Sequence, residues 1–212
     1  LLNIAKNKNA EIVSCGVKRF KDTIEKNENK VVEIKEYSST EAIANTYKTA
    51  DMEFVISCAK LFKSDIFDNL RFKVGVIHED EFVIHYIFDK VNKFAVTSQK
   101  LYYYFYNDNS ITIGNFKLKR IDILRALQDR AEFLKQNYLE LYKESFATFF
   151  VYRCIEIFFE IPKDFKEKKL AQKLTKQYFN LAYKGLKGIK SPSKKRFLIF
   201  KICPSLYRRL FR

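Results

Sequence analysis

The hydrophobic pattern changes its period near Phe116, and this change constrains the architecture more than any other feature of the sequence. Beyond that point apolar residues recur every three or four positions, at Leu118, Ile121, Leu124, Leu127, Ala131, Leu134 and Tyr138. This spacing places them on one face of a helix. Before that point, β-rich runs alternate with helical segments, and the runs are Glu11–Val17, Phe94–Thr97 and Lys100–Tyr106. The sequence therefore predicts an α/β part over residues 1–115 and an all-helical part over residues 116–212.

Composition agrees with this division. The 212 residues include only five glycines and three prolines, so the sequence has few turn-forming residues. This favours long helices over an all-β sandwich. The four cysteines never stand at C-x-x-C spacing, which argues against a zinc site or a disulfide framework and favours a reducing cytoplasm. We find no signal peptide and no apolar run long enough to span a membrane as a helix.

Local signals mark several helix ends. Ser38 and Glu41 have the spacing of a capping box, and Ser64-Asp65 offers a second N-cap signal. Pro162 should end a buried helix over Ser145–Glu160, and a basic helix should follow over Lys163–Gly185. The last segment, Lys194–Arg212, is interrupted by Pro204.

The positive charge is concentrated at the C-terminal end. The formal net charge is +15, and the stretch Lys163–Arg212 holds 16 Lys and Arg against two acids. Its end interleaves bases with large apolar side chains, which is typical of a segment that binds an anionic membrane surface. A helix packed on its own domain with a solvated basic face would give the same pattern. Nucleic acid is another acidic partner that such a charge allows.

Few residues outside the tail could carry chemistry. Glu79 and Asp80 follow Gly75 and open a helix, where a carboxylate could take a proton from a substrate hydroxyl or simply cap the helix. His78 and His85 are seven positions apart and have no matched carboxylate, so they are weak evidence for a metal site. Alternate members of the run Tyr102, Tyr103, Tyr104 and Tyr106 should be buried.

Four motifs stand in order along the first part of the chain, namely Ala10–Gly16, Lys60–Phe67, Gly75–Phe82, and Lys100–Tyr104 with Ser110-Ile111. Together they resemble the acceptor half of the bacterial family 2 glycosyltransferases of the GT-A fold. That half reads A-D-I-V-x-C-G, then W-x-K-L-[FY]-[KR], then G-x-[IY]-x-E-D-x-x-[FL], then L-Y-Y-Y-R with S-I.

The resemblance implies a Rossmann-like GT-A acceptor half over residues 1–115 and a looser likeness to family C-terminal extensions over residues 116–212. It implies an inverting transfer of a sugar from a nucleotide sugar to a cell-surface glycan or lipid-linked acceptor, as in polysaccharide biosynthesis. Asp80 would be the general base, and Glu79, Lys60 and His78 would lie in the acceptor site. A divalent cation, Mn²⁺ or Mg²⁺, would stabilise the leaving nucleoside diphosphate, with ligands outside this chain. We expect no nucleic-acid partner and a location on the inner face of the cytoplasmic membrane.

The sequence also departs from the family pattern. Cys58-Ala59 stands where the family has its tryptophan, and Phe105 and Asn107 stand where arginines often follow the tyrosines. No D-x-D metal motif is present, and the chain starts at Leu1 with its one methionine at Met52. We therefore expect the nucleotide-binding half, roughly ninety residues, to precede Leu1. A basic nucleic-acid-binding module and a catalytically degenerate scaffold of the same fold are the alternatives.

Overall fold

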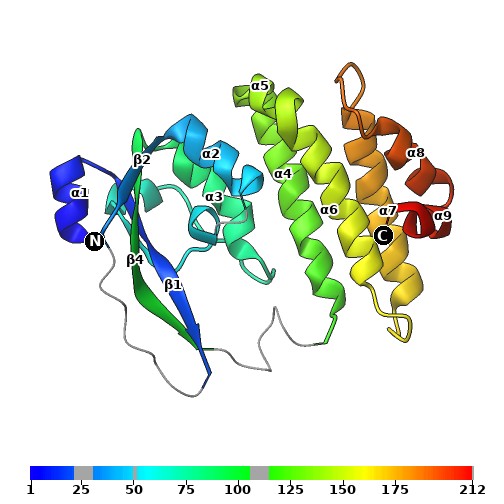
Figure 1. The fold of residues 1–212 in the computed structure, drawn as a ribbon, viewed down its shortest axis with the longest axis horizontal. Coiled ribbons are helices and arrows are strands. Elements are labelled where there is room, and N and C mark those ends of the chain that lie inside the picture. Colours follow the sequence, from blue (N-terminus) through cyan, green and yellow to red (C-terminus); the bar gives the residue numbers. More distant parts are fainter. Residues whose placement is uncertain (22–30, 50–51, 106–114, 212) are drawn as a thin grey trace. The chain divides into compact units, whose positions relative to one another are not determined.

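The structure, a computed structural model, describes residues 1–21, 31–49, 52–105 and 115–211 (Figure 1). It shows a mixed α/β protein. It divides into two compact units, Leu1–Asn115 and Phe116–Arg212. The first unit contains the strands, and the described part of the second contains helices. The predicted α/β class is therefore confirmed.

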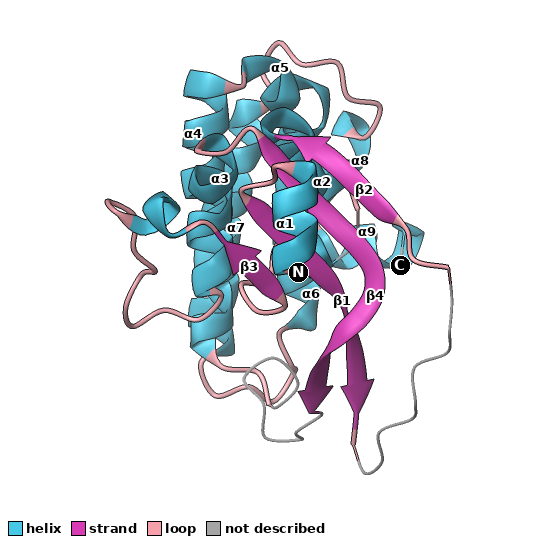
Figure 2. Ribbon diagram, turned by 90° about the vertical axis from the view of Figure 1, so that its left-hand side faces the viewer, coloured by secondary structure: helices cyan, strands magenta, loops and turns pink. Residues whose placement is uncertain are grey.

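The first unit is built on a four-stranded mixed sheet in the order β2-β4-β1-β3 (Figure 2). The central pair, β1 and β4, is parallel, while β3 runs antiparallel to β1 and β2 antiparallel to β4. The predicted run Glu11–Val17 lies mostly in β1, and the two later β-rich runs join into one strand, β4. The strands are β1 (Ile12–Phe20), β2 (Ile34–Ser38), β3 (Lys60–Phe62) and β4 (Lys93–Phe105).

Helices cover both faces of the paired core of this sheet. Val13 and its partner Ala95 pack with residues of α1 (Leu2–Lys8) on one face. On the other face Phe94 contacts Phe88 of α3 (Glu79–Asp89), with ring centroids 5.0 Å apart, and α3 packs against α2 (Ser39–Lys48). Because both faces are buried, β1 begins with a continuous buried run rather than an alternating one.

The capping signals are partly confirmed. Ser38 caps α2 through the predicted box: its Oγ accepts from the Glu41 N–H at 3.3 Å, and the Glu41 carboxylate accepts from the Ser38 N–H at 2.8 Å. The prediction for Ser64 was wrong, because the short 3₁₀ helix Ser64–Phe67 has Lys63 as its N-cap. Asp65 instead forms an ion pair with the Lys63 ammonium at 2.6 Å.

A break in register divides the β1–β4 pair in two. Cys15 pairs with Thr97, but Gly16 pairs with Lys100 and Val17 with Tyr102. Within the described residues, β2 and β3 stop pairing before this bulge, so β1 and β4 continue beyond it as a two-stranded ribbon. The predicted burial of alternate tyrosines was wrong for this reason: Tyr102 and Tyr103 are exposed and Tyr104 is half-buried. Tyr106, Asn107 and the Ser110-Ile111 motif lie outside the described residues.

The second unit begins with a 3₁₀ turn, Leu118–Ile121, and continues as helices. The predicted helix after Phe116 and the buried helix before Pro162 are both present. The basic helix begins at Lys168 and not at Lys163 as predicted, because the segment after Pro162 forms turns. The helices are α4 (Asp122–Asn137), α5 (Leu139–Leu141), a π-helical turn (Tyr142–Phe146), α6 (Ala147–Glu160), α7 (Lys168–Gly185), α8 (Lys194–Ile202) and α9 (Pro204–Phe211).

Candidate functional site

A loop with two left-handed residues presents the acidic start of α3. Gly75 has φ 80°, which glycine adopts without strain, and His78 has φ 60° at the N-cap of α3. A left-handed residue other than glycine stores conformational strain, which often marks a functional segment. Glu79, Asp80 and Glu81 then form the first turn, where they complement the helix dipole.

Asp80 is the residue of this turn whose pKa is shifted. Its side chain is half-buried, whereas that of Glu79 is exposed. Its Oδ1 accepts a hydrogen bond from the Glu81 backbone N–H at 2.9 Å, which favours the charged form. Burial, aided by the neighbouring charges of Glu81 and Glu79, outweighs that bond and raises the pKa of Asp80 to about 6.

Lys60, at the start of β3, lies within electrostatic reach of Asp80. Its side chain is half-buried, and its ammonium donates to the backbone carbonyl of Ile56. Burial lowers the pKa of Lys60 to about 8, while the charges of Cys58, Asp80 and Glu53 oppose that shift. The fold thus brings together two predicted residues that are twenty positions apart in the sequence.

The two histidines do not form a pair. His78 lies before the first turn of α3, in the left-handed conformation, so it does not continue the helical face that carries His85. His85 is fully buried and packs on the ring of Tyr86, with centroids 4.2 Å apart. Across the described ranges no group of three or more His, Cys, Asp or Glu could hold a metal ion.

A second strained residue lies directly before Lys60. Ala59 has φ 60°, and its carbonyl accepts hydrogen bonds from the Cys15 N–H at 3.0 Å and the Ser14 hydroxyl at 3.4 Å. Those bonds hold the start of β3 against β1 and so fix the backbone that carries Lys60. The sequence has Cys58-Ala59 here, where the glycosyltransferases that it resembles have a tryptophan, and nothing in the spacing predicts this conformation.

The first unit has a hollow of about 280 Å³ whose lining does not include Asp80 or Lys60. Glu53 connects it to the site, because Glu53 lines the hollow and its charge also acts on Lys60. Sequence reasoning missed Glu53, which has no motif around it. The wall carries charged, hydroxyl and aromatic side chains, namely Glu33, Lys35, Tyr37, Glu53, Phe54, Thr97, Ser98 and Lys100.

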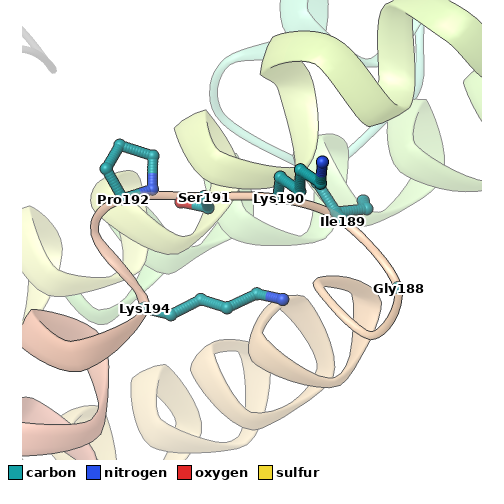
Figure 3. A pocket seen from close by; sticks show the side chains of 6 residues that line it. All are labelled: Gly188, Ile189, Lys190, Ser191, Pro192 and Lys194. Atoms are coloured by element: carbon teal, nitrogen blue, oxygen red, sulfur yellow. The ribbon is translucent and has the colours of Figure 1, made fainter.

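The second unit has a more open hollow of about 570 Å³ in the loop between α7 and α8 (Figure 3). Its lining residues are Gly188, Ile189, Lys190, Ser191, Pro192 and Lys194. The two lysines are its only ionisable side chains, and none of the predicted site residues lines it. Its lining includes the Ser191 hydroxyl but no carboxylate or histidine that could act as a general base.

Among the helices that the structure describes, none is both long and apolar enough to cross a membrane. Comparison of the sequence with models of known protein families gives no match, and comparison with curated proteins gives none either. The motif residues and the surroundings of Asp80 are therefore the features of this chain that bear on its function.

Proposed function

We propose that this chain is the acceptor-binding half of an inverting glycosyltransferase of the GT-A fold, with Asp80 as its general base. The observation that carries the proposal is the half-buried Asp80 at the start of α3, whose pKa is raised to about 6 and whose charge acts on Lys60. At neutral pH such a carboxylate is mostly ionised but is more basic than an ordinary aspartate. Both properties suit a base that takes a proton from a hydroxyl group.

The chemistry assigned to this chain is proton transfer on the acceptor side. Asp80 accepts the proton of the acceptor hydroxyl as its oxygen attacks the anomeric carbon of the nucleotide sugar. The bond from that carbon to the nucleoside diphosphate breaks, and the diphosphate leaves with the bonding electrons. The Lys60 ammonium donates to the Ile56 carbonyl. From that position it would either bind the acceptor or stabilise the ionised carboxylate of Asp80. His78, the N-cap of α3, and Glu79, in its first turn, directly precede Asp80 in the chain.

Donor and metal binding are not assigned to the described residues. The resemblance implies a divalent cation, but the described residues include no cluster of three or more His, Cys, Asp or Glu that could bind one. The sequence also has no D-x-D motif. A base on an acceptor-side helix does not need those ligands for its own proton transfer.

The arrangement of the motifs supports the same proposal. The Ala10–Gly16 run lies mainly in β1, the lysine motif begins in β3, and the tyrosine run lies in β4, so three motifs occupy adjacent strands. The Glu79-Asp80 motif opens α3, and the charge of Asp80 acts on Lys60 of β3. Two motifs that lie apart in the sequence are thus electrostatically linked. Glu53, whose charge also acts on Lys60, lines a polar hollow where part of an acceptor could bind.

The test is sugar transfer by the protein, with Asp80→Asn compared to wild type. Release of nucleoside diphosphate would be measured with Mn²⁺ or Mg²⁺ over a panel of nucleotide sugars and glycan acceptors. We expect Asp80→Asn to reduce kcat about 10²- to 10⁴-fold. Asp89→Asn is the matched control, because it makes the same change at an exposed acid at the other end of α3; its activity should stay within about twofold of wild type.

Equal activity of wild type and Asp80→Asn would refute the assignment of the base and leave Asp80 as a helix-capping acid. Inactivity of both proteins over the whole panel would favour a catalytically degenerate scaffold. In that case acceptor binding that survives in both proteins would still support the acceptor site.

A further inference from the structure

The C-terminal helices α8 and α9 are docked on the second unit by aromatic side chains. Phe197, Phe200 and Tyr207 are buried. The Phe200 ring lies 4.7 Å from that of Phe179 on α7 and 5.2 Å from that of Phe158 on α6, measured between centroids. The two helices also contact each other, with a bend at Cys203 and Pro204 as the first residue of α9. The packed-helix alternative is therefore correct for these aromatic residues.

Large aliphatic side chains on the same helices remain exposed. On α8, Leu198 and Ile202 are one turn apart and project roughly opposite to Phe197 and Phe200, given 100° per residue. On α9, Leu206 and Leu210 are one turn apart and lie on one side of the buried Tyr207, given 100° per residue. We call Leu198, Ile202, Leu206 and Leu210 the outer aliphatic residues. Ile202 is 75% exposed and Leu210 55%. Exposed aliphatic residues gathered on two adjacent short helices commonly mark an interaction surface.

The positive charge of α8 and α9 indicates an anionic partner. From Lys168 to the end of the sequence there is no Asp or Glu. Lys195, Lys201, Arg208 and Arg209 are exposed on the same two helices as the outer aliphatic residues. A surface that combines apolar side chains with uniform positive charge matches the interface of an anionic bilayer, where the chain segments are apolar and the headgroups are negative.

We propose that α8 and α9 form an interfacial membrane-binding surface, in which the outer aliphatic residues enter the headgroup region and the exposed bases contact anionic lipid. The proposal does not depend on the glycosyltransferase assignment. It differs from a single amphipathic anchor, since the aromatic residues of the segment hold it to its own unit. The surface is preformed, and lipid binding does not require α8 and α9 to leave the protein.

The first test changes the outer aliphatic residues. The full chain would be sedimented with vesicles of phosphatidylcholine, with and without phosphatidylglycerol. We expect Ile202→Gln with Leu210→Gln to lower the partition constant for anionic vesicles about tenfold. Leu2→Gln with Leu139→Gln is the matched control, because these leucines are 57% and 45% exposed on α1 and α5. The control should bind within about twofold of wild type.

The second test changes the charge. Lys195→Gln with Arg209→Gln should weaken binding to anionic vesicles about fivefold for each base removed, and added salt should reduce the difference. Lys6→Gln with Lys48→Gln is the matched control, because these exposed lysines lie in the first unit. Circular dichroism and urea unfolding would verify that each variant is folded.

Three results would overturn the proposal. One is unchanged binding of the Ile202/Leu210 variant to anionic vesicles, which would make the attraction purely electrostatic. Another is a concentration-dependent dimer of the wild-type chain that this variant abolishes, which would assign the surface to a second copy. The third is a failure to bind anionic vesicles together with tight, salt-sensitive binding of RNA or DNA.

Discussion

Replacing Asp80 by Asn should make the protein more stable at neutral pH while removing its base. Burial raises the pKa of Asp80 from its ordinary value of 3.8 to about 6 in the folded protein. The folded state therefore holds this proton more tightly than the unfolded state does. As the pH rises through this window, the free energy of unfolding of the wild type falls relative to that of the variant.

The magnitude follows from the size of the shift. About two pKa units correspond to roughly 3 kcal/mol, which is an upper bound because the carboxylate keeps some contact with water. Near pH 4 most of this penalty is absent, because the folded protein keeps the proton. At pH 7 it is fully present in the wild type, and asparagine does not incur it. The Glu81 N–H can still donate to the asparagine oxygen, so the local turn is preserved.

The assay is urea unfolding of wild type and Asp80→Asn at several pH values between 4 and 7. We expect the variant to gain stability relative to wild type as the pH rises, by up to about 3 kcal/mol. Glu11 and Glu36 have lowered pKa values and give the opposite slope, but they are common to both proteins and cancel in the difference. A difference that stays constant over this range would refute the argument that Asp80 is a desolvated carboxylate.

Three further changes test the packing. Ser38→Ala should lower the free energy of unfolding by about 1 kcal/mol, because the backbone N–H of Glu41 loses its cap; urea unfolding checks this. Gly185→Ala should cost about 1–3 kcal/mol, because an added Cβ would clash with the Tyr142 hydroxyl; Tyr142→Phe in the same chain should recover part of the loss. Phe200→Ala should cost about 3–5 kcal/mol, since the ring packs on both α6 and α7; a thermal midpoint close to that of wild type would contradict it.

The sequence predicted the elements well because their signals are local. Period-3.6 spacing, the Ser38 capping box and Pro162 each act within a few residues, and the helices they predicted are present. Errors came where the outcome depends on distant partners. The exposure of Tyr102 depends on the register break at Gly16, which no local pattern reveals.

The candidate site was predicted in part. Asp80 and Lys60 were chosen as motif residues, but only the fold brings them within electrostatic reach. Glu53 was missed because it becomes relevant through the hollow that it lines. The left-handed conformation of His78 was also missed, because a histidine before three acids reads as part of the helix.

The parallel pairing of β1 with β4 also constrains how the first unit folds. Ile12 pairs directly with Phe94, so the two central strands belong to opposite ends of that unit. A loop of some eighty residues must close before this pair can form, and contacts of such long range slow folding. On the ribosome, the sheet cannot be completed until β4 has emerged. The contacts of α6 with α7, by comparison, connect neighbouring segments. We therefore expect refolding to be limited by the sheet, with the helical unit acquiring its secondary structure first.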